Sequence, residues 1–571
     1  MTAHRKHLDY SIVSFPDFRL RCGVDLRIFT RQSKMSDSKN MIIDFVAEGF
    51  QQGWKHIDAS RLAADQNLEA DVVIIGSGAG GGNSAEILAQ SGLNVIIVEE
   101  GPLQTSRDFH MKENEAYSNL YQESAGRQTK DRGIKIFQGR MVGGGTGINW
   151  TTSFRTPAET LKYWAEEMGV LGFSEDEMLP WFEWSEKRYN IQDWKVPPNA
   201  NNSVLETGCE KLGVSWGKIR RNVTGCLNLG YCGTGCPVNA KQSTLVTTIP
   251  GALKEGATLI SKARAETIEI KNGKITELKC KAMTPRGNAT AVQTIKIKAR
   301  HYVLAAGSIG SPAIMLRSEN KILNPYGLVG TRTFLHPVNI SGAIMPFPVN
   351  GEYGAPQTSY SDHYIETRLD NQKPGFKLEC PPLQPMLIAT ALEGHGKVHA
   401  EIMSQRPFLQ VLVGLQRDGF HPESIGGKVY LKSDGTPGLD YPVSGYVWEG
   451  IRDAFIAMSE IQFASGAKAV APVHRDAGLY HSLDKVKKAI ASLPMETLKA
   501  RLFSAHVMGG CPMGENAAKS VVNSKGRHHE VENLSIFDGS VFPTSIAANP
   551  MESIFAVTAK FATELAKVLV M

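Results

Sequence analysis

The sequence predicts an α/β fold that contains a Rossmann-like dinucleotide-binding sheet. Residues 71–76, DVVIIG, form an apolar, β-branched run that is typical of a buried parallel strand. This run leads into GSGAGGG, in which Gly76, Gly78 and Gly81 satisfy the pattern G-x-G-x-x-G, and then into the helical stretch NSAEILAQSG. A second apolar run, NVIIV at 94–98, predicts the next strand of the same sheet.

The glycines, and the acid that follows the second strand, fit a dinucleotide. A pyrophosphate must approach bare backbone at the N-terminus of a helix, and glycines remove the side chains that would block it. Glu99 stands at the tip of the second strand, where a carboxylate accepts hydrogen bonds from the adenosine ribose hydroxyls. This pattern alone does not distinguish a flavin from a nicotinamide dinucleotide.

Two later segments favour a flavin domain. TIEIKNGKITELKCKA alternates apolar and polar residues around Asn272-Gly273, the dipeptide most suited to a two-residue hairpin turn. HYVLAAGSIGSPAIMLRS then predicts a strand that ends in the small residues Ala305, Ala306 and Gly307, followed by a helix. Small residues are needed where a second backbone segment approaches a bound nucleotide. A hairpin with a returning strand suits a flavin domain better than a nicotinamide domain.

Length and composition limit the class of protein. The chain has 571 residues, which is too long for one ordinary core, so we expect two domains. Hydrophobic residues make up 42% and charged residues 21%, the profile of a soluble globular protein. The net charge of +5, spread over 62 basic and 57 acidic residues, indicates no polyanionic partner such as nucleic acid. Because no apolar run reaches about 18 residues, we expect no transmembrane segment.

Cysteine usage and the first residues bear on location. Eight cysteines, most of them far apart in sequence, favour a reducing compartment over a disulfide scaffold. Residues 1–67 are expected to form an N-terminal leader and extension, and the first forty contain no apolar stretch long enough for a secretory signal. We therefore expect a cytoplasmic protein, either free or peripheral to a membrane.

Four segments resemble the glucose–methanol–choline (GMC) oxidoreductases, a family of FAD-dependent enzymes that oxidise alcohols. GRMVGGGTGINWTTSF at 139–154 is similar to the first family signature, and GSIGSPAIMLRSE at 307–319 to the second, with Glu319 in place of the closing glycine. SAHVMGGCPMG at 504–514 and LSIFDGSVFPTSIAANPMESI at 534–554 also resemble family segments. The first signature is matched at Gly139, Arg140, Gly143, Gly144, Thr146 and Asn149.

The resemblance implies a Rossmann-like FAD-binding domain assembled from discontinuous segments, with an inserted substrate-binding domain that contains a β-sheet. RTFLHPV at 332–338 and the cysteine loop look most like long-chain alcohol oxidases and bacterial dehydrogenases of the family. The FAD domain is expected at 68–158, 216–344 and 496–571, and the cap or substrate domain at 159–215 and 345–495.

Alcohol oxidation requires removal of a hydroxyl proton and transfer of a hydride to flavin N5. His506 is the candidate base, because imidazole acts near neutral pH and the family's catalytic histidine stands at this place in the motif. The resemblance gives Asn549 the role of holding the alcohol oxygen, although Asn549-Pro550 also fits a helix N-cap. His336 is left outside the catalytic set, because a structural role before a proline is as good an explanation.

The resemblance and the glycine motif together give the expected cofactor contacts. The helix that follows Pro550 has an apolar face, and its N-terminal dipole would stabilise negative charge on a reduced flavin. The expected FAD-binding residues are Gly76, Gly78, Gly81, Glu99, Gly143, Gly144, Thr146, Asn149, Ala306, Gly307, Asp538, Gly539, Pro550 and Met551.

Three cysteines lie within eleven residues, in CLNLGYCGTGCPVNAKQST. Cys226, Cys232 and Cys236 have the spacing C-x5-C-x3-C. A disulfide would leave one thiol unpaired, and zinc would need a fourth ligand. Three thiolates can hold a three-iron cluster, and the spacing is similar to that of family dehydrogenases that carry one. The sequence leaves open whether the loop is such an iron–sulfur site or a glycine-rich lid beside the flavin.

These observations predict an FAD enzyme that oxidises a primary, apolar or long-chain alcohol to its aldehyde. The expected electron acceptor is external, such as a cytochrome or a quinone. The alternatives are an alcohol oxidase that uses oxygen and forms hydrogen peroxide, and an FAD-containing cyanohydrin lyase. A nicotinamide-dependent enzyme is disfavoured by the two flavin signatures.

Overall fold

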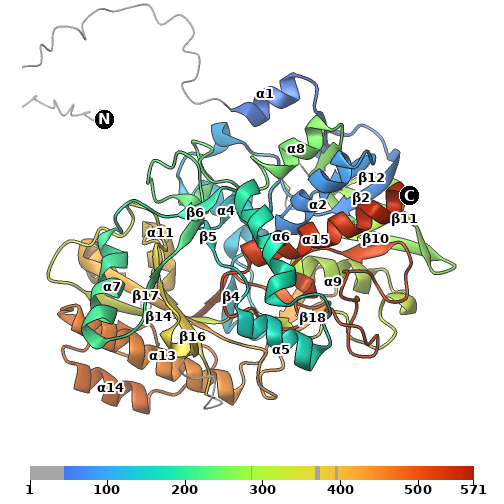
Figure 1. Ribbon diagram of the computed structural model, residues 1–571. Helices are drawn as coiled ribbons and strands as arrows, with labels where there is room; N and C mark the ends of the chain where they lie inside the picture. The colour runs from blue at the N-terminus through green and yellow to red at the C-terminus, as the bar shows by residue number, and fades with distance from the viewer. Residues whose placement is uncertain (1–43, 285, 288, 367–372, 393–395) are drawn as a thin grey trace, which may run out of the picture. The chain divides into compact units, whose positions relative to one another are not determined.

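The computed structural model describes residues 44–284, 286–287, 289–366, 373–392 and 396–571, so residues 1–43 of the expected leader lie outside the described part. Its two largest sheets each have eight strands. In Figure 1 the sheet with β2 and β12 lies beside α2 and α15, and the sheet with β14 and β17 lies beside α7, α13 and α14.

The first sheet is mainly parallel and has the strand order β1-β9-β3-β2-β12-β11-β10, with β23 paired to β12. β10 and β11 form the antiparallel hairpin expected from the sequence, and its turn residues Asn272 and Gly273 have φ of 51° and 74°. The strands are β1 (Lys55–Asp58), β2 (Gln66–Ile75), β3 (Val95–Val98), β9 (Thr258–Ser261), β10 (Ala263–Lys271), β11 (Lys274–Met283), β12 (Thr290–Leu304) and β23 (Leu534–Ile536).

Register brings the carboxyl ends of four parallel strands to one edge of this sheet. Ile75 of β2 pairs with Val98 of β3 and with Leu304 of β12, and Leu304 pairs in turn with Ile536 of β23. The residues that follow these strands therefore gather at the same edge, although they come from four distant parts of the chain. Ligands bind at this edge in open parallel sheets.

The second sheet is predominantly antiparallel and has the order β4-β21-β14-β17-β16-β15-β7, with β20 paired to β14. Its long strands β14 and β17 pack on α13, and the core between them includes Leu412, Ile451 and Phe455. The strands are β4 (Ile134–Ile136), β7 (Gly217–Lys218), β14 (Val338–Ile344), β15 (Ser359–Ser361), β16 (Phe376–Glu379), β17 (Leu409–Gln416), β20 (Ala469–Pro472) and β21 (Leu502–Ser504).

The described residues also form three small sheets. β5 (Thr152–Ser153), β8 (Arg220–Asn222) and β6 (Ile191–Asp193) form one, β13 (Thr333–Phe334) pairs with β22 (Met508–Gly509), and β18 (Lys428–Leu431) pairs with β19 (Pro437–Asp440). The α-helices are α1 (Phe45–Gln51), α2 (Ala79–Gln90), α3 (Glu113–Leu120), α4 (Gly145–Ile148), α5 (Ala158–Met168), α6 (Glu175–Arg188), α7 (Ala200–Leu212), α8 (Thr248–Lys254), α9 (Gly307–Arg317), α10 (His363–Glu366), α11 (Pro385–Ala391), α12 (Gly396–Ser404), α13 (Gly445–Ala464), α14 (Leu483–Ser492) and α15 (Met551–Val570).

Glu319, the departure from the second signature, lies two residues beyond the end of a helix. α9 ends at Arg317, and Glu319 follows with φ of 49°, in the left-handed region. Glycine adopts this conformation without strain, which explains why a glycine is suited to this position.

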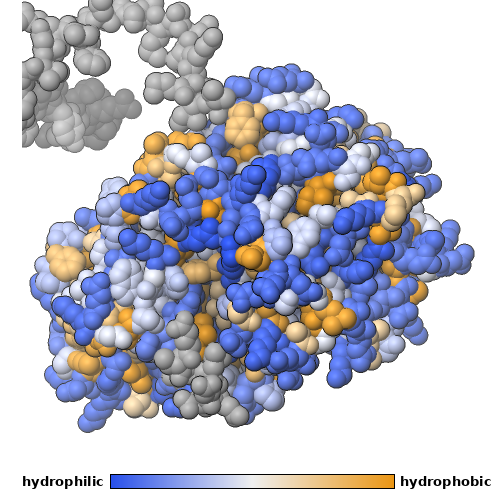
Figure 2. Space-filling model, viewed as in Figure 1, coloured by the Kyte–Doolittle hydropathy of each residue, from blue (hydrophilic) through white to orange (hydrophobic). Residues whose placement is uncertain are grey.

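The surface is polar on the face shown in Figure 2, where hydrophobic residues are scattered among hydrophilic ones. Within the described part of the chain, no helix is both long and apolar enough to span a membrane.

Close packing of α2 against the first sheet gives a test of the fold. A Cβ on Gly80 would lie 1.8 Å from the carbonyl oxygen of Phe537, which follows β23, so Gly80→Ala must push the helix away from the sheet. Overpacking of this kind costs about 1–3 kcal/mol. We expect a clearly lower urea midpoint for Gly80→Ala. Gly445→Ala is the control, because a Cβ at the start of α13 meets nothing within 4 Å. Equal midpoints for the two variants would contradict the packing.

Candidate active site

A cavity of about 980 Å³ opens at the edge where the four strand ends meet. Its wall includes Gly76 after β2, Glu99 after β3, Ala305 after β12 and Asp538 after β23. The cavity continues along one face of the second sheet, where β14 and β17 supply the lining. It therefore joins a region suited to a dinucleotide with a region walled by the other sheet.

The glycine-rich turn fits a dinucleotide because it presents bare backbone to the cavity. Gly78 and Gly144 face each other, and a Cβ on Gly144 would lie 2.8 Å from the Cα of Gly78. The first turn of α2 lines the cavity, and its N-cap residue Gly78 provides no side-chain hydrogen bond. A helix N-terminus of this kind attracts phosphate.

Gly81 and Gly143, the other glycines of the two motifs, allow close backbone packing or an unusual backbone conformation. Gly81 and Gly143 do not line the cavity. A Cβ on Gly81 would lie 1.9 Å from the carbonyl oxygen of Gly76, and Gly143 has φ of 100°. We expected both to contact the cofactor, whereas their positions fit a role in shaping the loops that do.

Glu99 lines the cavity but is already hydrogen-bonded. Its carboxylate accepts from Ser77 Oγ at 2.6 Å and from the Gly101 N–H at 2.8 Å, and burial raises its pKa. Asp538 is similarly fixed, since it accepts from the Gly307 N–H at 2.9 Å and from Ser311 Oγ at 2.6 Å. Both acids thus hold the strand ends together at the cavity wall.

The remaining expected cofactor residues line the same cavity. Thr146 Oγ1 donates to the Gly143 carbonyl at 2.6 Å, and Asn149 Nδ2 contacts the sulfur of Met551 at 2.7 Å. The latter contact joins the first signature to the start of α15. The cavity wall includes Gly76, Gly78, Glu99, Gly144, Thr146, Asn149, Ala306, Gly307, Asp538, Gly539, Pro550 and Met551.

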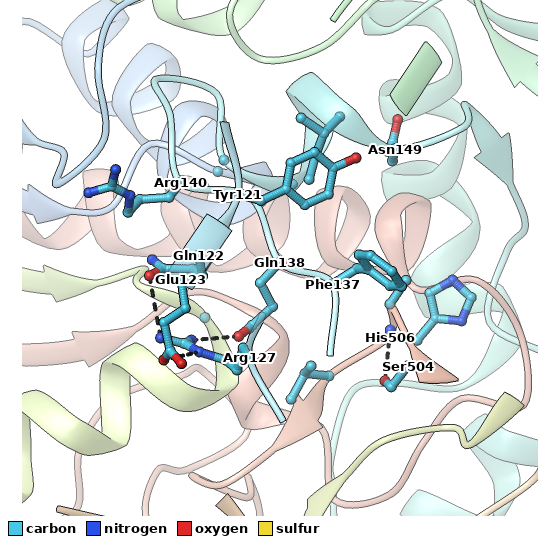
Figure 3. Close-up of a pocket in the computed structure, with 18 of the residues that line it drawn as sticks. Tyr121, Gln122, Glu123, Arg127, Phe137, Gln138, Arg140, Asn149, Ser504 and His506 are labelled. Atoms are coloured by element: carbon cyan, nitrogen blue, oxygen red, sulfur yellow. Dashed lines mark hydrogen bonds and ion pairs between the residues drawn. The ribbon is translucent and has the colours of Figure 1, made fainter. Parts of the chain in front are cut away.

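A polar cluster that the sequence did not indicate forms another part of the wall (Figure 3). Arg127 donates to Gln138 Oε1 at 2.7 Å and to Glu123 Oε1 at 3.0 Å, and it also reaches Gln122. Phe137 separates this cluster from His506 in the view of Figure 3.

His506 lines the cavity and is joined to a second histidine. Its Nδ1 lies 3.1 Å from Nδ1 of His336, which is fully buried. His336 has φ of 48°, and its backbone N–H donates to Asp418 at 3.2 Å, so a buried acid holds this strained residue. His336 therefore packs directly behind His506. The two histidines are 170 positions apart in the chain, so the sequence did not indicate this contact.

Asn549 lies on the other side of His506. Its Nδ2 is 3.3 Å from His506 Nε2 and 3.3 Å from Glu379 Oε2, while its Oδ1 has no partner among the described residues. The side chain makes no N-cap hydrogen bond to α15. The capping role that competed with a site role is thus absent from this structure.

Burial determines the charge of these groups. Desolvation lowers the pKa of His506 to about 4 and lowers the pKa of His336 well below its usual value. Both imidazoles are therefore neutral near pH 7, and a neutral imidazole can accept a proton. Desolvation raises the pKa of Glu379 to about 7.

The second sheet presents an aliphatic wall to the cavity. Register pairs Val338 with Leu415 and Ile340 with Val413, so these side chains share one face of the sheet. The opposite face packs on α13 through polar contacts such as Ser341 to Gln462 at 2.7 Å. The cavity-facing residues of β14, β17 and α11 include Val338, Ile340, Leu387, Ile388, Leu409, Val411, Val413 and Leu415.

The cysteine loop does not form the metal site that its spacing allowed. Cys226, Cys232 and Cys236 are free thiols, and the described residues contain no cluster of three or more metal-ligating side chains. Two buried cations lie beside the loop instead: Lys241 Nζ donates to the Cys232 carbonyl at 2.7 Å, and Arg221 Nη2 lies 3.9 Å from Cys232 Sγ. The iron–sulfur cluster that the spacing left open is therefore unsupported.

Three polar residues beside His506 and Asn549 were not assigned to the site from sequence. His336 was noted but left outside the catalytic set, and Glu379 and Gln357 carried no motif. Gln357 lines the cavity and donates to Glu379 at 2.5 Å. Glu379 ends β16, whereas His336 and Gln357 lie just before β14 and β15. These residues reach the site only through the packing of the second sheet, so no local pattern could have marked them.

Comparison with known proteins agrees with this geometry. Residues 117–338 match the N-terminal part of the GMC oxidoreductase family, and residues 422–558 match its C-terminal part. The long-chain-alcohol oxidase FAO4A of Arabidopsis thaliana is 27% identical over 86% of this chain and 67% of its own length. An uncharacterized GMC-type oxidoreductase, y4nJ, of Sinorhizobium fredii is 27% identical over 88% of this chain and 95% of its own length.

The fold is also similar to that of a solved structure. Aspergillus oryzae formate oxidase, in a study of its FAD modification, aligns with a TM-score of 0.64 and 15% identity over 88% of this chain and 99% of its own length. The four strand ends, the bare glycine turn and the matched segments lead to one conclusion: this chain belongs to the GMC oxidoreductase family and is an oxidoreductase.

Proposed function

We propose that this protein oxidises a primary alcohol with an apolar chain to the aldehyde, with FAD as its resident cofactor. The aliphatic wall that continues the cavity beyond His506 and Asn549 carries this proposal. FAD would lie with its pyrophosphate against Gly78 and Gly144 and its ring near Gly539 and Met551. When bound, FAD supplies the hydride acceptor for the carbon that carries the hydroxyl group.

His506 would act as the base. Its imidazole lines the cavity and is neutral above about pH 4, so it can take the hydroxyl proton at Nε2. His336 contacts Nδ1 of the same ring and would hold its orientation. The Asn549 amide would donate a hydrogen bond to the alcohol oxygen as negative charge develops there.

The aliphatic wall supports an apolar chain over a sugar or a small polar alcohol. β14 begins at Val338, directly after the segment that contains His336, so residues further along β14 lie further from His506. Gly342 is opposite Val411, and the four residue steps from Val338 to Gly342 span roughly 13 Å of strand. The wall is long enough for an extended hydrocarbon chain, whose burial contributes about 0.8 kcal/mol per methylene.

Two classes of electron acceptor fit the proposed reaction. An external carrier such as a cytochrome or a quinone is our first proposal, and oxygen is the alternative, favoured by the relatives named as long-chain-alcohol oxidases. Peroxide assays under air would separate the two. Stoichiometric peroxide would establish the oxidase, and turnover only with an added quinone or cytochrome would establish the dehydrogenase.

Loss of the base should stop chemistry without loss of cofactor. We expect His506→Ala to retain FAD and to lose roughly two to four orders of magnitude in the rate of anaerobic flavin reduction by an alcohol. His481→Ala is the control, because His481 is exposed and does not line the cavity. An unchanged rate in His506→Ala would remove this residue from its role.

The aliphatic wall should select chain length. Val411→Trp places bulk in the far part of the cavity, so we expect kcat/KM for long-chain primary alcohols to fall by more than about tenfold, while short-chain alcohols change little. Val470→Leu, in the core on the other side of the sheet, is a matched control for overpacking. A uniform loss across all chain lengths would contradict the assignment of this wall.

A further inference from the structure

Glu379 is a buried acid whose place beside the active site has no role in the reaction described above. It is the last residue of β16, is fully buried and does not line the cavity. Its Oε2 accepts hydrogen bonds from Asn549 Nδ2 at 3.3 Å and from Gln357 Nε2 at 2.5 Å. Because Glu379 cannot touch a molecule in the cavity, any effect on the reaction must pass through these partners.

The orientation of the Asn549 amide decides whether it helps or opposes the reaction. An amide presents two N–H donors on one side and a carbonyl acceptor on the other. A donor at the alcohol oxygen stabilises the negative charge that develops as the proton leaves, whereas an acceptor there repels it. Both known contacts of this amide, to Glu379 and to His506, are made by its nitrogen.

We propose that Glu379 is a positioning residue that locks the Asn549 amide with its nitrogen toward His506 Nε2, where the alcohol oxygen must bind. This inference rests on the proposed oxidation of an alcohol by His506 and Asn549. The carboxylate can only accept, so it holds one N–H of Asn549 and leaves the other directed at the position of the substrate oxygen. A flipped amide would place Oδ1 against the carboxylate, with no hydrogen between them.

A further hydrogen bond fixes the orientation of Gln357 beside Glu379. Thr152 Oγ1 donates to Gln357 Oε1 at 2.6 Å, which turns the Gln357 nitrogen toward Glu379. Gln357 Nε2 then donates to the same carboxylate oxygen that Asn549 contacts. Each partner in the row from Thr152 to Asn549 thus has its donor directed at an acceptor, and the row ends at His506.

The charged groups around Glu379 influence the pH at which its carboxyl group is ionised. Lys377, two residues earlier on β16, is fully buried and pairs with Asp362 at 2.6 Å; Lys377 lowers and Asp362 raises the pKa of Glu379. Arg221 of β8 donates to the Gln357 backbone carbonyl at 3.2 Å, and Glu206 of α7 accepts from Ser359 on the adjacent strand β15. Burial outweighs these effects and raises the pKa of Glu379 to about 7.

The sign of the pH effect follows from this raised pKa. Above about pH 7 Glu379 is ionised and offers a charged acceptor, and below about pH 7 it becomes neutral. Charge-assisted hydrogen bonds are about twice as strong as neutral ones, so protonation loosens the lock. His506 protonates only near pH 4, which separates the two effects.

The test measures flavin reduction in the FAD-loaded holoenzyme for Glu379→Gln and Glu379→Leu, with a primary alkanol as substrate. We expect Glu379→Leu to lower the limiting reduction rate roughly 10- to 100-fold with less than about a threefold change in KM, because the lost interaction acts in the transition state. Glu379→Gln, which can still accept, should retain most of the rate. Only the wild type should lose rate as the pH falls through about 7.

Glu206→Leu is the control, since it removes a neighbouring acid that does not contact Asn549. If Glu206→Leu and Glu379→Leu lose the same rate, the role of Glu379 is structural and the proposal is wrong. A wild-type pH limb near 7 that persists in Glu379→Gln would also overturn it.

A second measurement does not depend on the substrate. In holoenzyme labelled with 15N-asparagine, the side-chain signal of Asn549 is identified by its loss in Asn549→Ala. It should shift with a midpoint near pH 7 in the wild type and stay fixed in Glu379→Gln. If no alcohol reduces the flavin but this shift occurs, the proposed function is wrong while the positioning of Asn549 by Glu379 is supported. If the Asn549 signal shows no shift near pH 7 in either protein, Glu379 does not position Asn549 and the proposal is wrong.

Discussion

The structure depends on close backbone contact at the edge of the first sheet. Gly76 and Gly80 approach the carbonyl oxygens of Ala305 and Phe537 so closely that a Cβ would lie 2.2 and 1.8 Å from them. These contacts hold the start of α2 against the ends of β12 and β23. The loops that follow four strands then meet at one place, and Asp538 and Glu99 fasten them with hydrogen bonds. Without this edge, the proposed cofactor region and the C-terminal residues His506 and Asn549 would not lie in one cavity.

The cavity combines a polar environment with an apolar one. One part offers bare backbone and polar side chains, which suits a dinucleotide, and the other offers the aliphatic face of the second sheet. Burial at their junction keeps the imidazoles neutral and raises the pKa of Glu379. In the proposed function, low solvent access places a base, a hydrogen-bond donor and a site for an apolar chain side by side.

Much of the first sheet could be predicted from local sequence. The strands around Gly76, the hairpin at Asn272-Gly273 and the strand before Gly307 each carry a short-range pattern, and all three occur. The resemblance implied a β-sheet in the substrate domain, but its strands could not be placed from local sequence. The face of β17 toward the cavity is aliphatic, and its face toward α13 carries polar residues such as Gln410, which accepts a hydrogen bond from Gln462 of α13 at 2.8 Å. Because every residue of β17 is buried, its two faces show no simple alternation of apolar and polar residues. Glu379 and His336 were missed as partners for a related reason: they join Asn549 and His506 across about 170 residues of chain. The cysteine spacing left an iron–sulfur site open, and the described residues contain no cluster of metal-ligating side chains there.

The most direct test of the whole account is anaerobic mixing of the purified holoenzyme with primary alkanols of increasing length, followed by the visible absorbance of the flavin. The account predicts a yellow protein whose absorbance bleaches with these alcohols, and faster at low concentration as the chain lengthens and fills the aliphatic wall. A protein that remains colourless after exposure to FAD, or a bound flavin that stays oxidised with every alcohol in the series, would contradict it.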